Sequence, residues 1–477
     1  MSLTRRSALG TLGLAAPAFA GWGLASHAAT HPSAAATRAR RYPGVDGKLL
    51  VNRAQAHDVM ERYGVDGLVA LDPMNVYYVT NTIPLMTWFR MPNPAFAVLP
   101  RDVSKPPYLV THLTQALDLA NRRGRGEELP ELVTFSSPTN WEDYVNASPQ
   151  QMTVKPRVGS KANGDDPNTH GWAVNRDAKH TTIEERWIAA QRESFEAAAP
   201  TIAWAVVKAL EESGLTKGTI GVDDERIATL LQRIGFTGVK FVPGANLFRR
   251  IRVIKSPVEI ALMRIAGENN SVATERVIRG LQKGMTAEDI EQSFAVEAAK
   301  LGSTKVSFLP GMAIAGFPDG QAVEGKVFAI DAVSYFRQYH GDCGRTIVLG
   351  EPSTEVRQRV KAHRAGYDAV YSSVRAGLKF SDIRRIAADA MVKAGMPAAT
   401  VIVNPHSVGL EHGDNPARDD LPFDMLEDLT LEENMVITVD LASLELGWGS
   451  LHHEDLVRIT KTGFEPFPAV REPFVTV

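Results

Sequence analysis

Hydrophobic and polar positions alternate in a regular way from about residue 48 onward. Apolar residues at helical spacing over 49–63 predict an amphipathic helix. Short apolar runs, several bounded by prolines, predict β-strands at 65–71, 76–79, 96–99 and 108–111. This mixture of helices and strands indicates a small α/β domain.

The pattern changes twice more before the middle of the chain. Residues 136–185 are rich in Asn, Asp, Ser, Thr, Pro and Lys, which predicts a long irregular arm. A helix at 184–213, a strand at 218–222 and a further helix are expected to complete the first domain, over residues 48–250. Ser256, Pro257 and Glu259 then form a helix-start signature, with a capping residue, a proline at the first turn and a capping-box glutamate. A second domain over residues 251–477 is therefore predicted.

Two segments of the second domain resemble each other. Residues 284–302 and 377–395 share six identical positions, and each starts and ends with glycine. Any two capped amphipathic helices share such features, so the match has a plain explanation. The alternative is a duplicated α+β half, in which a pseudo-twofold sheet places a site between the two halves.

Several apolar strands of the second domain end on carboxylates. Asp331 closes the run 327–331, Asp342 follows eleven residues later, and Asp440 closes 435–440. Glu454 lies in another strand-like run, and His406 in a segment with glycine. Buried carboxylates are costly unless they are paired or bind a cation. Together these five residues predict a metal site.

Composition narrows the chemistry of that site. The chain has 477 residues, 44% hydrophobic content and a net charge of −3, with no charge block typical of nucleic-acid binding. Its single cysteine, Cys343, excludes internal disulfides and a cysteine-rich zinc site, and we interpret it as a small buried filler. Arg345, Arg458 or Lys326 could neutralise part of the acidic charge as ion pairs. Four acids and one imidazole suit two divalent ions, Mn²⁺, Fe²⁺, Co²⁺ or Zn²⁺.

The N-terminus predicts export. Arg5 and Arg6 precede an uncharged run over 8–25, and small residues offer cleavage after Ala20 or Ala29. The paired arginines favour the twin-arginine route. A transmembrane anchor is the alternative, but the run holds four glycines and a proline and is short for a span. We expect an export signal over 1–29, a disordered linker over 30–47 and a periplasmic or otherwise exported protein with no membrane contact after cleavage.

Residues 250–470 resemble the pita-bread metallopeptidases, the group of methionine aminopeptidases, aminopeptidase P and prolidase. The resemblance rests on the order and spacing of the five residues above and on the segment 341–346. Residues 72–80 resemble the smaller domain of prolidase-type members. The resemblance implies an α+β pita-bread fold, with a pseudo-twofold duplicated half around a curved antiparallel sheet, behind a smaller N-terminal α/β domain.

The resemblance also implies roles for individual residues. Asp331 and Asp342 would chelate one ion, Asp342 and Glu454 would bridge, and His406 with Asp440 would complete the other ion. Arg345 and Thr346 would orient the acidic ligands without binding the metal ions themselves. His412 would act as proton donor or oxyanion stabiliser, unless it is a solvated loop residue. His340, His452 and His453 are interpreted as structural or supporting.

Four departures from the family pattern bear on function. Asp440 stands where the family usually has glutamate, so its carboxylate is one methylene shorter. The family's substrate-contacting histidine before the first aspartate is missing from 313–319, and Ile402 replaces another histidine. His412 follows His406 by six residues instead of seven.

Three function classes follow from these observations. The first is an exported Xaa-Pro peptidase in which water activated by two metal ions attacks an amide bond of a small peptide. The second is a non-peptidase pita-bread enzyme acting on a small zwitterion, similar to dimethylsulfoniopropionate lyases, creatinase or ectoine hydrolase. Trp88, Phe89 and Arg90 could cover such a ligand, or they could be packing or a subunit contact. The third is a binding protein without activity. We expect a homodimer and no nucleic-acid partner.

Overall fold

Two β-sheets organise the part of the chain that the computed structural model describes. That part comprises residues 42, 44–91, 93–135, 174–175, 177–199, 201–308, 317–421 and 425–477. The predicted export signal, most of the predicted linker, most of the polar arm and residues 313–316 lie outside it. Within the described residues, no helix combines the length and apolar character needed to cross a bilayer.

The first sheet has six strands in the order β4-β3-β2-β1-β5-β6. It mixes antiparallel pairs around β2 with parallel pairs at β3–β4 and β1–β5–β6. The strands predicted at 65–71, 96–99, 108–111 and 218–222 are all present. The bounds are β1 Gly67–Ala70, β2 Phe96–Pro100, β3 Tyr108–His112, β4 Glu131–Phe135, β5 Gly218–Val222 and β6 Val239–Pro243.

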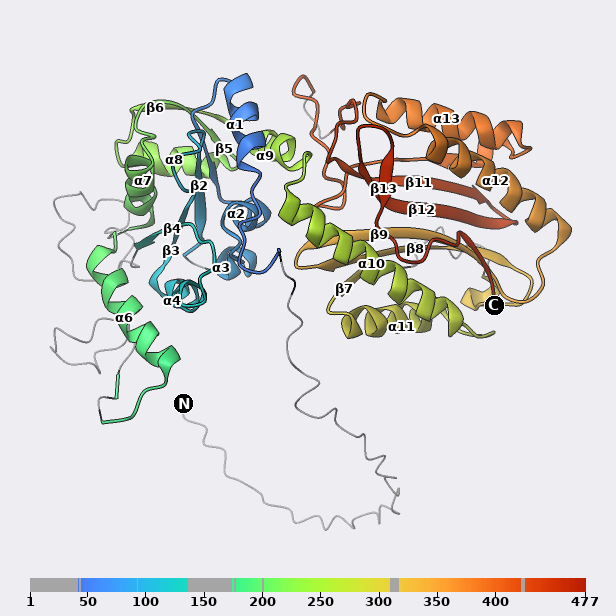
Figure 1. Cartoon of the computed structure of the whole chain (residues 1–477), viewed down its shortest axis with the longest axis horizontal. Coiled ribbons are helices and arrows are strands. Elements are labelled where there is room, and N and C mark those ends of the chain that lie inside the picture. Colours follow the sequence, from blue (N-terminus) through green and yellow to red (C-terminus); the bar gives the residue numbers. More distant parts are fainter. Residues whose placement is uncertain are drawn as a thin grey trace, which may run out of the picture. The chain divides into compact units, whose positions relative to one another are not determined.

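Helices surround this sheet (Figure 1). The predicted helix at 49–63 is present as α1, shortened at its start because Asn52 caps it by accepting from the Gln55 N–H. The helices of this half are α1 Arg53–Arg62, α2 Pro73–Thr80, α3 Leu85–Trp88, α4 Leu113–Arg123, α6 Thr182–Ala197, α7 Ile202–Glu212, α8 Glu225–Arg233 and α9 Ala245–Arg252.

Two secondary-structure predictions for this half were wrong. The strand expected at 76–79 is part of helix α2, whose start is set by the Asp72 side chain accepting from two backbone N–H groups, with Pro73 in the first turn. The apolar run is continuous because nearly the whole helix is buried, which hides its helical period. The helix expected at 184–213 is two helices, α6 and α7; Thr201 caps the second, directly after a proline in the sequence.

The second sheet has eight strands and carries the predicted acids. Its main order is β10-β11-β12-β9-β8-β7, with β13 beside β12 and β14 beside β9. The strands are β7 Thr304–Ser307, β8 Val327–Phe336, β9 Tyr339–Val348, β10 Val401–Val403, β11 Val436–Glu445, β12 Gly449–Ile459, β13 Phe464–Pro466 and β14 Phe474–Thr476, with short 3-10 turns at Pro318–Gly320 and Ala398–Thr400.

Four helices pack along this sheet: α10 Pro257–Arg279, α11 Ala287–Lys300, α12 Thr354–Ser373 and α13 Phe380–Lys393. Helix α10 contacts β8 and β9, and α12 contacts β11 and β12 (Figure 1). The predicted capping box at the start of α10 is confirmed, since Ser256 and Glu259 each bond the other's backbone N–H.

The repeated segments are structurally equivalent. Helices α11 and α13 are displaced by the same 93 residues at both ends, 287 to 380 and 300 to 393. Gly284 and Gly377 precede them, both with positive φ. Helix α11 contacts β7 and α13 contacts β10, and these two strands form the opposite ends of the main strand order. These positions support a duplicated half over the explanation that any two capped helices look alike.

Candidate metal centre

The predicted acids meet because four neighbouring strands are in register. Asp331 on β8 pairs with Gly344 on β9, Gly344 pairs with Glu454 on β12, and Glu454 pairs with Asp440 on β11. Paired residues of adjacent strands point to the same face of a sheet. Three carboxylates therefore stand in one row on the face away from the helices. Asp342 lies two residues along β9 from Gly344 and shares this face.

A cavity of about 430 Å³ opens above the row. Three of the predicted acids and three imidazoles line it together with aliphatic and small polar side chains. The ionisable lining residues are Asp331, Asp440, Glu454, His406, His412 and His452. Ile402 lines the same cavity, so an aliphatic side chain occupies part of its wall.

Asp342 lies at the base of the site and is completely buried. Among the described residues, no amide, hydroxyl or cationic donor reaches either of its carboxylate oxygens, and the neighbouring Glu454 carboxyl could donate to it only when protonated. Burial, and then repulsion from Asp331 and Asp440, raises the pKa of Asp342 well above its ordinary value. Burial, and then repulsion from Asp342 for Glu454 and from Asp440 for Asp331, raises the pKa of these two acids as well. Burial lowers the pKa of His452, but the facing carboxylates outweigh it and raise this pKa to about 9. One imidazolium faces four acids, so the cluster still has less positive than potential negative charge.

His406 and His412 come from one loop between β10 and β11. His406 is buried, and its Nδ1 lies 3.2 Å from the Ser407 carbonyl oxygen, which leaves Nε2 free to act as a ligand. His412 is half-exposed, with its ring 4.9 Å from that of His406 and its Nδ1 3.7 Å from Asp342. Partial desolvation and the neighbouring His406 and His340 lower the pKa of His412 to about 4. His412 is therefore a neutral imidazole at pH 7.

A buried ionic network holds this loop. The guanidinium of Arg252 donates to Asp414 at 2.8 Å and to Glu411 at 2.6 Å, and it also contacts Asn75 of α2. Lys255 lies 3.3 Å from the second oxygen of Asp414. Burial opposes ionisation of Asp414, but the two cations outweigh it and lower its pKa. The histidine loop is thus fixed from the α9–α10 connection.

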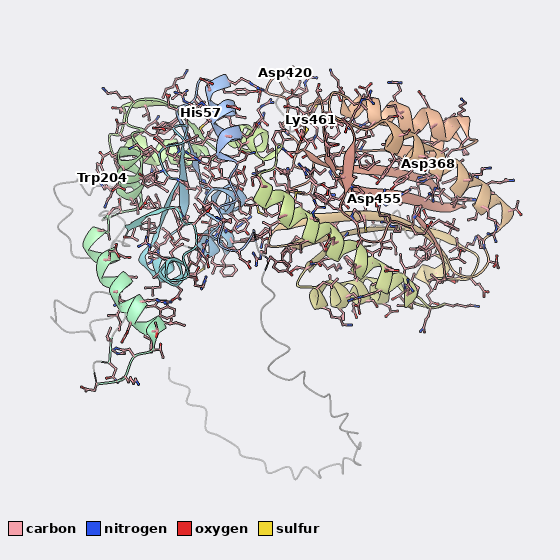
Figure 2. All side chains as sticks on the ribbon, in the orientation of Figure 1. His57, Trp204, Asp368, Asp420, Asp455 and Lys461 are labelled. Carbon is pink, nitrogen blue, oxygen red and sulfur yellow. The ribbon has the colours of Figure 1, made fainter. Side chains whose placement is uncertain are left out.

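The opposite face of the strands has its own network under the helices. Arg345 donates to Asp455 at 3.0 Å and to the Glu454 carbonyl at 2.7 Å; Asp455 is labelled in Figure 2. The Tyr367 hydroxyl on α12 also donates to Asp455, at 2.6 Å. Arg345 therefore supports the backbone of Glu454 and makes no hydrogen bond to its carboxylate. Cys343 is buried on this face beside α10, and burial raises its pKa to about 11, which agrees with a filler role.

His452 is the site residue whose role the sequence did not reveal. Its Nε2 lies 2.9 Å from Asp440 and 3.5 Å from Glu454, and its ring is buried. Thr346 bonds both the N–H and the carbonyl of His452, so this threonine orients the histidine. The available signal was spacing: His452 precedes Glu454 by two residues, and alternate residues of a strand share a face.

These residues fit divalent cations. Asp342, His406 and His412 offer ligand atoms that lie within 4.8 Å of one another, and so do Asp331, His452 and Glu454. Carboxylate oxygens and imidazole nitrogens are the donors that first-row divalent metals accept. The unpartnered oxygens of Asp342 supply the further observation that positive charge is needed here. Asp440, predicted as a ligand, lies in the same cavity and bonds His452.

Comparison with known proteins agrees with this geometry. Residues 261–461 match the model for metallopeptidase family M24. A probable dipeptidase PepE from Mycobacterium bovis is 27% identical over 235 residues, which cover 47% of this chain and 61% of that protein. The match thus spans less than two thirds of that relative's length.

Solved structures extend the likeness to the smaller domain. A Xaa-Pro dipeptidase from Bacillus anthracis gives a TM-score of 0.59 at 15% identity, covering 89% of this chain and 99% of that one. Dipeptidase PepE from Mycobacterium ulcerans gives 0.57 at 18% identity, covering 89% and 97%. At these identities the likeness establishes the fold, and the predicted pita-bread fold with its smaller N-terminal domain is confirmed. The chain is thus similar to metallopeptidase family M24 over residues 261–461, within a fold that it shares with solved dipeptidases along most of its length.

Proposed function

We propose that this protein is a metal-dependent hydrolase of small peptides, of Xaa-Pro type, that uses two divalent ions. The observation that carries the proposal is the row of Asp331, Glu454 and Asp440 across paired strands, with Asp342 unpartnered below it. Relatives named as dipeptidases and Xaa-Pro dipeptidases support the peptide class of substrate.

The ligand set would follow the family resemblance. Asp331 and Asp342 would hold one ion, His406 and Asp440 the other, and Asp342 with Glu454 would bridge them. Divalent ions at such a centre supply positive charge that acidifies water and polarises a carbonyl group. Mn²⁺, Fe²⁺, Co²⁺ and Zn²⁺ are the candidate ions, because carboxylate and imidazole ligands suit them.

His412 is the proposed catalytic residue of the chain itself. Its ring lies at the cavity beside His406, and its lowered pKa keeps it neutral at pH 7. A neutral imidazole can donate one hydrogen bond through its protonated nitrogen. His412 would use it to steady the negative charge that develops on the carbonyl oxygen during amide cleavage.

A second candidate function rests on Ile402. This residue and other aliphatic side chains such as Leu444 form part of the cavity wall. A wall of this kind suits the apolar body of a small zwitterion as well as a peptide side chain. The alternative is therefore a pita-bread enzyme that cleaves or eliminates from a small betaine-like or sulfonium compound.

Activity assays on protein of measured metal content separate the two functions. One set of reactions contains Xaa-Pro dipeptides and tripeptides; the other contains betaine-like and sulfonium zwitterions. We expect peptide turnover, and we expect Asp342→Ala to lower it by more than about a hundredfold, since even residues that only support a metal site commonly contribute roughly 10- to 100-fold. Asp420→Ala, at an exposed carboxylate paired with Arg418, is the matched control.

Two results would contradict the peptidase proposal. Fully metallated protein that cleaves no peptide but turns over a zwitterion would establish the second candidate. Full activity after complete metal removal would exclude the metal-dependent peptidase and favour a creatinase-like enzyme of the second class.

Export and self-association complete the proposal. We propose that the twin-arginine segment directs the protein to the periplasm and that two copies form a homodimer. Exposed apolar side chains at Leu85, Trp88, Phe89 and Met91 on and beside α3 offer a surface for a subunit contact.

A further inference from the structure

We propose that Nε2 of His452 is a direct ligand of one of the two metal ions, together with Asp331 and Glu454. This inference rests on the metal-dependent site proposed above and adds an imidazole to its ligand set. Three observations carry it: the hydrogen bond made by the other ring nitrogen, the fixed position of the ring, and the closeness of Nε2 to the acidic ligand atoms.

The first observation assigns the proton on the imidazole. Nδ1 of His452 lies 3.2 Å from the backbone carbonyl oxygen of Ile330. A carbonyl oxygen only accepts hydrogen bonds, so Nδ1 must carry the proton. In the neutral ring Nε2 then presents a lone pair, directed at Asp440 (2.9 Å) and Glu454 (3.5 Å). A lone pair facing carboxylates is repulsive unless a proton or a metal ion lies between them.

The second observation is that the ring is held before any ligand arrives. A Cβ atom at Gly344 would lie 2.5 Å from Nδ1 of His452, so only glycine leaves room for the ring at this point of β9. Thr346, which also lies on β9, holds the backbone of His452 through hydrogen bonds to its N–H and carbonyl groups. Histidines that bind metals commonly donate their second ring N–H to a carbonyl or carboxylate in this way.

The third observation is the closeness of Nε2 of His452 to the acidic ligand atoms. Four carboxylates meet here, those of Asp331, Asp342, Asp440 and Glu454. A proton on His452 supplies one positive charge, which leaves the other three carboxylates to be neutralised by protons of their own or by bound cations. Two dications would compensate all four negative charges. Ligand atoms of Asp331, Glu454 and His452 all lie within 4.8 Å of one another, so one dication could bind all three residues.

A consequence is a preference among metals. With His406 in one ligand group and His452 in the other, both ions would have at least one nitrogen donor. Imidazole ligands favour Zn²⁺, Fe²⁺ and Co²⁺ over ions that prefer all-oxygen sites, such as Mn²⁺ and Mg²⁺. We therefore expect the metal-free protein to bind Co²⁺ and Zn²⁺ more tightly than Mn²⁺ at both positions.

The test is a titration of metal-free protein with Co²⁺, in which calorimetry measures the binding events and visible absorption measures the metal bands. For His452→Gln we expect two binding events as in the unsubstituted protein, with the affinity of one reduced by about tenfold or more. We also expect its visible bands to shift, because an oxygen donor replaces nitrogen. His57→Gln, which removes an imidazole from α1 in the smaller domain (Figure 2), should change neither quantity.

The spectrum distinguishes a ligand from a residue that only positions Asp440. Reduced affinity with unshifted bands would overturn the inference, and so would unchanged affinity and bands. Both results leave the proposed metal site intact. Protein that binds no Co²⁺ or Zn²⁺ at all would contradict the metal site itself.

A second measurement covers the case in which His452→Gln fails to fold. A crystal structure of the unsubstituted protein loaded with Zn²⁺ should place Nε2 of His452 about 2.0–2.1 Å from an ion. A hydrogen-bonded His452–Asp440 pair with no ion on Nε2 would refute the inference.

Discussion

The buried carboxylate of Asp342 needs a compensating positive charge. It is fully buried, other carboxylates surround it, and among the described residues only a protonated Glu454 could donate to its oxygens. Structures keep such a group where a ligand compensates it, and the group then lowers stability when the ligand is missing. The metal-free protein should therefore be strained at this point.

This strain makes the stability of the metal-free protein depend on pH. The pKa values of Asp342 and Glu454 are raised in the folded state, so the folded chain holds protons that the unfolded chain releases above about pH 4. The resulting stability is present at low pH and is lost as pH rises through the folded-state values. We expect the melting temperature of metal-free protein to fall over this range, with each proton contributing up to about 1.4 kcal/mol per pH unit.

Asp342→Asn isolates this effect from the other titrating groups. The variant should lose less stability with rising pH than the unsubstituted protein, measured by calorimetry in the presence of a chelator. Added metal should abolish the difference in slope by stabilising the unsubstituted protein most at high pH. Parallel pH profiles for the two metal-free proteins would contradict the assignment of strain to Asp342.

At the scale of secondary-structure elements, the loop between β10 and β11 decides the geometry of the site. It carries His406 and His412 but contributes no long strand to the sheet. Its position depends on Asp414, which accepts from Arg252 at the end of α9 and from Lys255 between α9 and α10. The two imidazoles are thus positioned by residues more than 150 positions earlier in the chain.

Asp414→Asn should therefore disturb both stability and metal binding. It leaves Arg252 and Lys255 as buried charges with a weaker partner, and removal of one partner of a buried ion pair costs about 3–5 kcal/mol. We expect a lower denaturation midpoint and weaker metal binding in calorimetry. Asp420→Asn, six residues further on and exposed (Figure 2), should change neither. Equal effects of the two substitutions would contradict the positioning role of Asp414.

At the scale of the whole molecule, the half that carries the candidate metal centre and the smaller domain share a buried boundary. Arg252 contacts Asn75 of α2, and the Ser256 hydroxyl donates to the Leu50 carbonyl at 2.9 Å. The residue that caps helix α10 therefore also ties this helix to the chain before α1. We expect the described residues from 44 onward to unfold together rather than as two separate units.

The export prediction also belongs to this scale. Substituting Arg5→Lys together with Arg6→Lys should keep the full-length chain in the cytoplasm of a host that has a twin-arginine pathway, since that pathway depends on the paired arginines. Cell fractionation with immunoblotting measures the exported fraction. The control pair Arg40→Lys and Arg41→Lys lies beyond the predicted signal and should leave export unchanged. Export of the first variant at the normal level would refute the predicted route.

Local sequence determined much of this protein. The helix start at Ser256, the repeated helices α11 and α13, and the strands that carry Asp331 and Asp440 follow from capping, glycine placement and apolar runs. The prediction that those two strands end on the acids was wrong, because β8 continues to Phe336 and β11 to Glu445. These features depend on neighbours within a few residues, which is why they can be inferred without tertiary structure. The prediction for 76–79 was wrong for the same reason, because burial of all of α2 removes the helical period from the local pattern.

Tertiary structure decided which side chains share a site. The row of Asp331, Glu454 and Asp440 depends on strand register, and the entry of His452 depends on a glycine in a neighbouring strand. The loop position of His412 depends on a distant ion pair. Contacts of this kind join residues that are far apart in the chain, so sequence proposes the chemical groups, and packing and register determine which of them meet.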